Sequence, residues 1–269
     1  MDAKDLIKAG RLSDARATLT GELKLFPSNV SARVLLFQVL CFFGEWDRAI
    51  HQLEVIVSQE TRSETGVQLY KNLVLAEKER SEVMRFQGQP SCLPESPPHL
   101  GTHVEACRSL MGGNVEHARD LFDQLETNRA PLQGTLDGRP FTGFTESDSF
   151  LCVFFEAFVH HRYFWIPFDR VKEMIIVPPQ TLFDLLWIPA RITTRDDTTV
   201  GCHLPVLYPA TCTHEDDRVK LGRVTDWRPL GDSFLKGYGQ HVYKAGEEEA
   251  ALLEMRTLTF DHSPEEAES

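Results

Sequence analysis

The chain has 269 residues, of which 42% are hydrophobic and 25% charged, as in ordinary folded proteins with one large or two modest domains. A formal net charge of −12 argues against nucleic acid and against an anionic membrane surface as partners, because both require a basic face. We expect neither a signal peptide nor a membrane span, since no apolar run is long enough. Six cysteines without framework spacing predict reduced thiols and a cytoplasmic protein.

Three residues in the first half recur at a fixed distance. Gly10, Ala15 and Leu19 return as Gly44, Ala49 and Leu53, a shift of 34 residues each time, and a further copy, Gly113, Ala118 and Phe122, is offset by one. This is the period of tetratricopeptide repeats, in which a glycine joins two helices and a small residue lets them approach. The pattern predicts an all-α, tetratricopeptide-like superhelix over residues 1–130. The alternative is a plain helical bundle with accidental repetition.

Local signals agree with helices in this region. Ser13 and Asp14 can start a helix after Gly10. The stretch VSARVLLFQVLCFF is apolar on nearly all sides, which is typical of a central helix, and TGVQLYKNLVLAEKERSEVMRF has helical periodicity. A linker-like segment, QGQPSCLPESPP, then leads to another helical pair across residues 99–127.

A superhelix of this kind offers a concave groove to an extended segment or a helix of another protein. Counting back from the glycine at position 44 places Gln38, Cys41 and Phe42 on that groove, and Gln68 and Asn72 fall at comparable places one period later. We expect these five residues to line a partner-binding groove, where the amides can bond a guest backbone. Alternatively, the amides bond a nearby carbonyl or water.

The second half changes pattern within NRAPLQGTLDGRP, residues 128–140, where turn residues dominate. Residues 131–262 are expected to form an α+β domain with a mainly antiparallel sheet, followed by a disordered acidic tail, residues 263–269. SDSFLCVFFEAFVHHR is predicted to be a helix capped by Ser147 or Asp148. The predicted strands lie in RYFWI, EMIIV, TVGCHLPVL, RVTDW, QHVYK and LLEMRTLTF, and LFDLLWIPARITT is expected to be either a further strand or a short helix running into a strand.

Two sets of residues have the right types for a metal site. One is His99, His103 and Cys107, spaced along one helical face, and the other is Cys202–His203 with Cys212–His214. The first set spans about 12 Å of helix and does not converge on one ion. The second lacks the usual knuckle spacing. We therefore expect no metal.

Catalysis has one candidate group, the carboxylates of Glu156 and Asp184 within apolar surroundings, with His160 or His161 as a partner. The alternative is structural: Arg162, Arg170 and Arg191 are near in sequence and could neutralise these carboxylates as ion pairs. No nucleophile elbow, phosphate loop, dinucleotide fingerprint or zinc-protease motif occurs. We therefore favour a protein that is not an enzyme and needs no cofactor; a hydrolase-like enzyme is the alternative.

Three segments resemble the ImpE family, also called TagJ or SciE-like. They are the stretch from Phe141 to Ser149, RYFWIPFDRVKEMIIVPPQTLFDLLWIPA from Arg162 to Ala190, and GYGQHVYKAGEEEAALLEMRTLTF. The resemblance covers nearly the whole chain and implies that the motif and core residues of the second domain are Asp148, Tyr163, Trp165, Pro167, Asp184, Trp187 and Pro189.

The resemblance also implies a function. Members of the ImpE family are non-enzymatic accessory proteins of bacterial type VI secretion, so the resemblance implies that role for this chain. The implied partners are the small sheath subunit (TssB-type), bound through a helical segment, and the ClpV-type AAA+ unfoldase. Tethering sheath subunits to the unfoldase and capping the free sheath subunit remain two open mechanisms.

Overall fold

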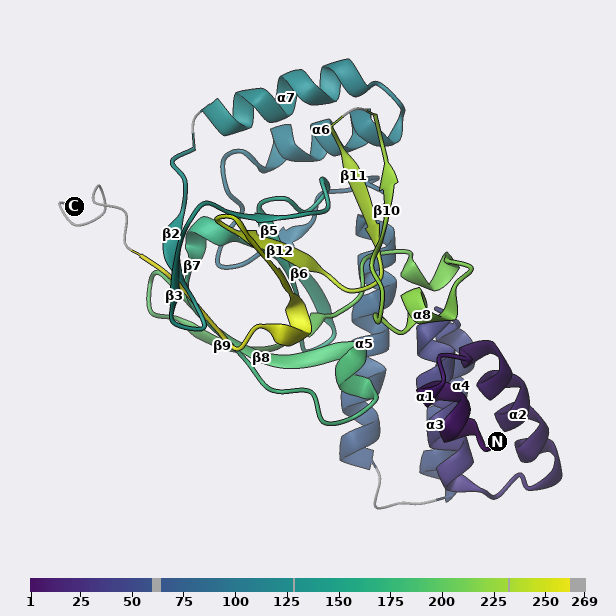
Figure 1. The fold of residues 1–269 in the computed structure, drawn as a ribbon. Coiled ribbons are helices and arrows are strands. Elements are labelled where there is room, and N and C mark those ends of the chain that lie inside the picture. Colours follow the sequence, from purple (N-terminus) through teal and green to yellow (C-terminus); the bar gives the residue numbers. More distant parts are fainter. Residues whose placement is uncertain (60–63, 128, 232, 262–269) are drawn as a thin grey trace.

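The structure is a computed structural model that describes residues 1–59, 64–127, 129–231 and 233–261. A helical region comes first and a mixed, mostly antiparallel sheet follows, which confirms the predicted fold class (Figure 1). Within the described residues, no helix is long and apolar enough to cross a membrane. The predicted acidic tail, residues 263–269, lies outside the described part of the chain.

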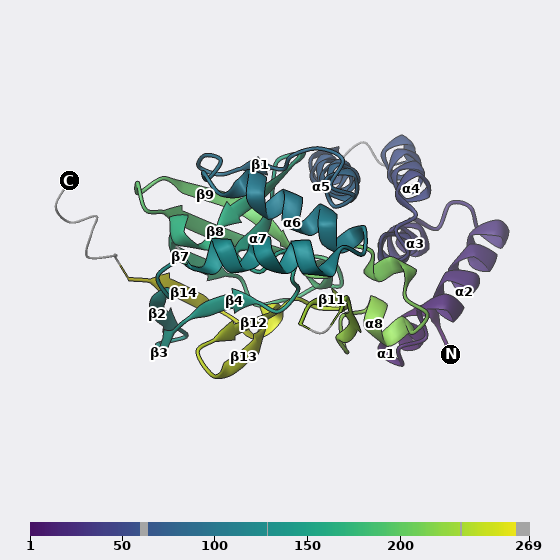
Figure 2. The same cartoon turned by 90° about the horizontal axis from the view of Figure 1, so that it is seen from above.

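The helical region ends shortly before the first long run of strands. Its helices are α1 (Ala3–Lys8), α2 (Leu12–Leu25), α3 (Val30–Phe42), α4 (Trp46–Gln59), α5 (Glu64–Val83), α6 (Leu100–Met111) and α7 (Val115–Thr127). The pair α6 and α7 was predicted and is confirmed. Seen from above, this pair lies across the sheet, away from α1–α4 (Figure 2).

The 34-residue period marks the turns between paired helices. Gly10 joins α1 to α2 and Gly44 joins α3 to α4, with φ of +75° and +65°, a region that glycine adopts without steric cost. Ala15 and Ala49 are fully buried on the second helix of each pair. Gly113 makes the same turn between α6 and α7, with φ of +79°. The period therefore reports real helix pairs.

The strands form one large and two small sheets. They are β1 (Ser91–Cys92), β2 (Gln133–Leu136), β3 (Arg139–Thr142), β4 (Phe144–Glu146), β5 (Phe154–Val159), β6 (Arg162–Pro167), β7 (Val171–Ile176), β8 (Trp187–Thr194), β9 (Thr199–Pro205), β10 (Asp226–Pro229), β11 (Leu235–Tyr238), β12 (Val242–Ala245), β13 (Glu248–Ala251) and β14 (Thr257–Phe260). The large sheet has the order β1-β6-β5-β9-β8-β7-β14-β2-β3, and only the β1–β6 pairing in it is parallel among the strands described. The small sheets are β13-β12-β4 and β10-β11.

The predicted helix in residues 147–162 is wrong. This stretch contains β5, which pairs with β6 on one side and β9 on the other. Residues 154–158 are all buried, because a central strand covered on both faces is apolar without alternation and cannot be told from a buried helix by periodicity. Ser147 and Asp148 therefore cap no helix. The linker-like segment before α6 also contains the edge strand β1.

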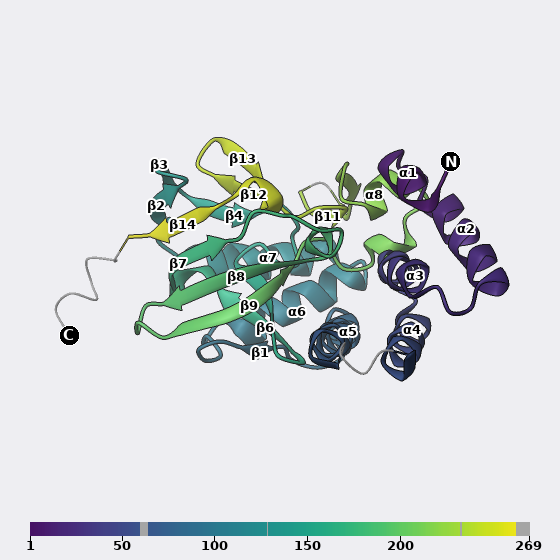
Figure 3. The same cartoon turned by 90° about the horizontal axis from the view of Figure 1, so that it is seen from below.

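Helix α5 lies between the stack α1–α4 and the sheet, and it contacts both α4 and β6 (Figure 3). Side chains of the sheet region pack against the helices at this place. Phe183, in a short 3-10 turn before β8, stacks on Tyr70 of α5 with ring centroids 3.9 Å apart, and its ring is 5.4 Å from that of Phe37 on α3. One continuous hydrophobic core runs through both regions.

A second connection is made by residues 207–223, which we call the clasp. The clasp leaves the sheet after β9 and reaches the turns of the helix pairs. Asp217 accepts hydrogen bonds from the Ser13 backbone N–H (2.7 Å) and hydroxyl (3.1 Å), so a distant residue caps α2, which has no side-chain cap of its own. Arg223 donates to the carbonyls of Ile7 and Lys8 at the end of α1. The α1–α2 turn is thus held by the clasp as well as by its glycine.

The clasp explains why one repeat glycine should be less replaceable than another. A Cβ at Gly44 would lie 2.8 Å from Cys212 Sγ in the clasp, whereas a Cβ at Gly113 would meet nothing within 4 Å. Both positions have positive φ, which costs an alanine about 1–2 kcal/mol. We expect Gly113→Ala to lower the unfolding free energy by about that amount and Gly44→Ala by about 2–4 kcal/mol, because overpacking adds to it.

Urea denaturation of both variants measures this difference. In a Cys212→Ala background, the cost of Gly44→Ala should fall toward that of Gly113→Ala, since the clashing sulfur is gone. Equal costs for the two glycines in the parent chain would contradict the role assigned to the clasp.

Candidate functional site

The junction between α5 and the sheet holds a buried group of charged residues. Arg80, on α5, is 4% exposed and donates two hydrogen bonds to Glu156 of β5, at 2.7 and 2.6 Å. Its remaining donors reach the Leu207 carbonyl at 2.7 Å and Glu77, one turn back on α5, at 3.3 Å. One guanidinium therefore joins the helical region, the sheet and the start of the clasp.

His241, which precedes β12, lies between two carboxylates in the same group. Its Nε2 is 3.1 Å from Glu156 Oε2, and its Nδ1 is 3.8 Å from Glu146 Oε1. Burial alone would lower the pKa of His241, but these carboxylates raise it to about 9. Burial alone would raise the pKa of Glu156, but Arg80 and His241 hold it at about 2. Glu156 is therefore ionised and His241 protonated at neutral pH.

Aromatic hydroxyl and indole groups complete the polar contacts. Tyr163 donates to Glu156 and accepts from the Trp165 indole at 2.6 Å. The Trp187 indole donates to Glu77 at 3.0 Å. Tyr208, in the clasp, donates to Glu146. The large aromatic residues of this region thus satisfy buried charges in addition to burying apolar area.

Asp148 organises the loop before β5. It accepts hydrogen bonds from the backbone N–H of Phe150 (2.8 Å) and of Gly237 on β11 (2.7 Å). Burial and the nearby charge of Glu146 raise the pKa of Asp148 to about 7. Its two acceptor contacts fix the β10–β11 hairpin to the loop, which makes a positioning role sufficient to explain its burial.

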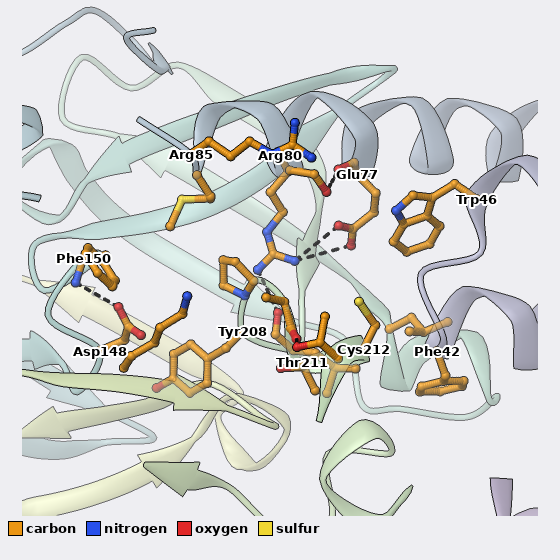
Figure 4. Close-up of a pocket in the computed structure, with 18 of the residues that line it drawn as sticks. Phe42, Trp46, Glu77, Arg80, Arg85, Asp148, Phe150, Tyr208, Thr211 and Cys212 are labelled. Carbon is orange, nitrogen blue, oxygen red and sulfur yellow. Dashed lines mark hydrogen bonds and ion pairs between the residues drawn. The ribbon is translucent and has the colours of Figure 1, made fainter. Parts of the chain in front are cut away.

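A cavity of about 360 Å³ opens beside this charged group, and we call it the junction cavity (Figure 4). Arg80 and Glu77 extend into it from α5, opposite Tyr208 and Thr211 of the clasp. The apolar part of its wall is formed by Phe42, Trp46, Met84, Met111, Leu186 and Leu207. Arg85 and Lys236 also line it. Glu156, Glu146 and His241 do not line the cavity.

The structure separates the five residues predicted to line the partner groove. Cys41 and Phe42 are each 1% exposed and line the junction cavity together. Gln68 and Asn72 instead bond each other at 2.9 Å on a solvent-facing side of α5, and they do not line this cavity. Gln38 is half-buried on α3 and also does not line it.

The residues that the family resemblance assigned to the second domain are mostly interior. Tyr163, Trp165 and Trp187 are at most 1% exposed. Asp148 and Pro167 are buried, whereas Pro189 and Asp184 are half-buried. Asp184 accepts backbone N–H bonds from residues 180 and 181 at 2.8 and 2.7 Å, which holds the turn before β8.

The carboxylates considered for catalysis do not come together with the predicted histidines. His160 and His161 are exposed in the β5–β6 turn, and Glu156 is neutralised by Arg80 and His241 rather than by any of the three arginines near it in sequence. An ionised, doubly paired Glu156 is neither a free base nor a proton donor.

The metal candidates have other partners. His103 Nε2 lies 2.8 Å from the Phe150 carbonyl, and Cys107 Sγ approaches the same oxygen at 3.8 Å. His214 contacts Asp226 at 3.1 Å in the clasp region. No group of three or more histidine, cysteine or acidic side chains among the described residues could hold a metal ion.

The sequence alone does not predict Arg80, Glu77, His241 and Tyr208 as members of this group. Arg80 and Glu156 are 76 residues apart, and nothing local in either segment indicates the pairing. The one available signal was compositional: an arginine within the apolar face of α5 requires a buried partner.

Removing Arg80 should leave the buried carboxylates of Glu156 and Glu77 without their cationic partner. We expect Arg80→Met to lower the unfolding free energy by about 3–5 kcal/mol, because a buried pair broken on one side leaves an uncompensated charge. Arg162→Met, which removes an exposed pair with Glu79 at 3.0 Å, should cost less than about 1 kcal/mol. Urea denaturation compares the two. Adding Glu156→Gln to Arg80→Met should restore part of the loss, and purely additive costs would contradict the pairing.

His241 predicts a stability change on the alkaline side. Its pKa is about 9 in the folded protein against 6.5 for an ordinary histidine, so its stabilisation is complete below about pH 6.5 and is lost as pH rises through 9. We expect the urea midpoint of the parent chain to fall between pH 7.5 and 9.5 and that of His241→Gln to change less. The variant should also be less stable at pH 7.5. Parallel pH profiles for the two chains would rule out a protonated His241.

Comparison with known proteins gives three findings. The family model described as ImpE protein matches residues 138–259. The type VI secretion system accessory component TagJ of Pseudomonas aeruginosa is 31% identical over 261 residues, which cover 97% of this chain and 92% of that protein. The crystal structure of a Vibrio parahaemolyticus protein superposes with a TM-score of 0.87 at 23% identity, covering 98% of each chain, and shows the same fold.

The matched segment includes β5, β6, β8 and β12, which carry or flank Glu156, Tyr163, Trp187 and His241. The similarity to TagJ covers 97% of this chain and therefore extends into the helical region as well. By the match to the ImpE model and the similarity to TagJ, this chain belongs to the ImpE family.

Proposed function

We propose that this protein is an accessory component of a bacterial type VI secretion system that binds a helical segment of the small sheath subunit (TssB-type) and links it to the ClpV-type unfoldase. Membership of the ImpE family and the similarity to TagJ support the accessory role. Such a role places the protein in the cytoplasm and asks for binding surfaces rather than for catalysis. The sheath subunit and the unfoldase themselves come from the family resemblance.

The observation that carries the docking proposal is the composition of the junction cavity. Its wall offers apolar side chains of α3, of α4 and of the turn after α5, among them Phe42, Trp46 and Met84. A helix places apolar residues at i, i+3 and i+4 on one face, and one such residue can enter a cavity of this size as an anchor. Met111 is 51% exposed at the same cavity and extends the apolar surface outward.

The charges at this cavity favour an acidic flank on the partner helix. Arg85 and Lys236 make no ion pair within the described part of the chain, although the protein as a whole carries a net charge of −12. The Lys236 ammonium lies 5.8 Å from the Phe150 ring and 5.7 Å from the Tyr238 ring, which leaves its outer side open. Acidic side chains beside the apolar anchor would meet these cations and exclude unsuitable partners.

Of the five predicted groove residues, we propose that Cys41 and Phe42 form the floor of this docking site. Gln68 and Asn72, with the exposed Leu69 between them, form a separate surface on α5. Gln38, on α3, belongs to neither surface. The α5 surface is the alternative docking place, and the two surfaces can be distinguished because no residue is common to both.

Affinity capture with the purified small sheath subunit tests the proposal. We expect Met111→Glu combined with Lys236→Glu to reduce retention at least about tenfold, which corresponds to about 1.4 kcal/mol, because the pair adds negative charge where an acidic flank would lie. The matched control is Gln68→Lys combined with Asn72→Lys on α5, which should retain the subunit. Both double variants should keep the parent unfolding midpoint within a small shift, since the altered side chains reach solvent.

Loss of retention only in the α5 variant would move the docking site to the alternative surface. Absence of binding by the parent chain at micromolar concentrations would overturn the proposal. Adding the unfoldase separates the two mechanisms: tethering predicts its capture together with the sheath subunit, whereas capping predicts capture of the sheath subunit alone.

A further inference from the structure

A second cavity, of about 710 Å³, lies on another side of the molecule, and we call it the α6–α7 cavity. It is lined by residues of α6 and α7, of the segment that leads from α7 to β2, and of β4 and β12, all of which lie close together in Figure 2. Its volume is within the range of sites for small organic ligands, about 300–1,000 Å³. None of its lining residues lines the junction cavity.

The walls of the α6–α7 cavity are mainly apolar. Its apolar lining includes Phe122 and Leu125 of α7, Phe144 of β4, Val153, Leu132 and two prolines. These side chains suit the hydrocarbon or aromatic part of a ligand, but apolar contacts do not fix the ligand's orientation. Without a polar group, the cavity would therefore bind apolar ligands weakly and without selectivity.

Arg129 supplies that polar group. It is half-buried in the cavity lining, and its guanidinium makes no hydrogen bond or ion pair with any described residue. Its charge lies close enough to His99, His103 and Cys152 to affect the pKa of each, and these three residues also line the cavity. A guanidinium with five donors and no partner among the described residues, in a protein of net charge −12, is a candidate site for an anion.

The other ionisable residues of the lining do not take that role. Burial lowers the pKa of His99 and brings that of His103 to about 4, so both rings are neutral near pH 7. Lys244 is exposed and is 3.8 Å from Glu249. Glu126 is also in the lining, which disfavours ligands with several negative charges. One negative group beside Arg129 is what the lining accommodates.

We propose that the α6–α7 cavity binds a small amphipathic monocarboxylate, with the carboxylate on Arg129 and the apolar body between α7 and β4. A carboxylate matches the two parallel N–H donors of a guanidinium, whereas a polyanion would meet Glu126. This site is separate from the docking site proposed for the sheath subunit, and it stands or falls independently of it.

Isothermal titration calorimetry with sodium octanoate tests the proposal on the full chain. We expect saturable binding with a dissociation constant at or below about 1 mM, as befits a ligand of this size. Octan-1-ol, which has the same chain without the charge, should bind at least about tenfold more weakly. Arg129→Met should weaken octanoate binding by about tenfold or more and leave octan-1-ol unaffected. Arg85→Met, which alters a cation of the junction cavity, is the matched control and should bind octanoate like the parent.

Three results would overturn the proposal. They are no saturable octanoate binding, equal binding of octanoate and octan-1-ol, and unchanged octanoate binding by Arg129→Met. A chain ending at Asp261 that binds octanoate much more tightly than the full chain would also overturn it, because the acidic residues 262–269 would then be the occupant. Sheath-subunit capture by Arg129→Met should equal that of the parent, so failure here leaves the docking proposal intact.

Discussion

The structure depends on one buried ion pair, between Arg80 of α5 and Glu156 of β5. Taking two charges out of water is expensive, and further contacts of Arg80 and Glu156 offset part of that cost. Glu77, the Leu207 carbonyl, Tyr163 and His241 provide them. Helix, sheet and clasp therefore have one relative position in which this group is satisfied.

The buried Arg80–Glu156 pair also holds the walls of the junction cavity in place. Its walls come from α3, α4, α5, the clasp and β11, which are far apart in sequence. A cavity between independently moving parts would change shape, and a partner helix would have to order it at a cost in free energy. Arg80 and the clasp contacts to the α1–α2 turn fix the walls beforehand. A pocket with fixed walls and a few cations suits the adaptor role that we propose for this protein.

How much of this could be read from the sequence differs between its two halves. The spacing of Gly10 and Gly44 predicts the helix pairs because a left-handed turn and a close helix contact each require a particular residue type. The strands after residue 160 follow from alternation and turn residues. The run FFEAF misleads because a strand buried on both faces loses its alternation. Cys41 and Phe42 were predicted from their repeat position to line a groove, and both line the junction cavity, whereas the Arg80 pairing is a long-range contact without a local signal.

The repeat glycines show why local rules alone did not reveal the clasp. A tetratricopeptide turn needs glycine for its backbone, so the residue type is explained before any tertiary contact is considered. At Gly44 the missing Cβ also admits Cys212, and near Gly10 it admits Arg218, whose Cγ would lie 3.3 Å from a Cβ there. Glycine satisfies both the positive φ of the turn and the close approach of the clasp. The sequence therefore does not reveal the second requirement. The turns of the helical stack are consequently covered by the protein's own clasp at the two glycines that the repeat requires.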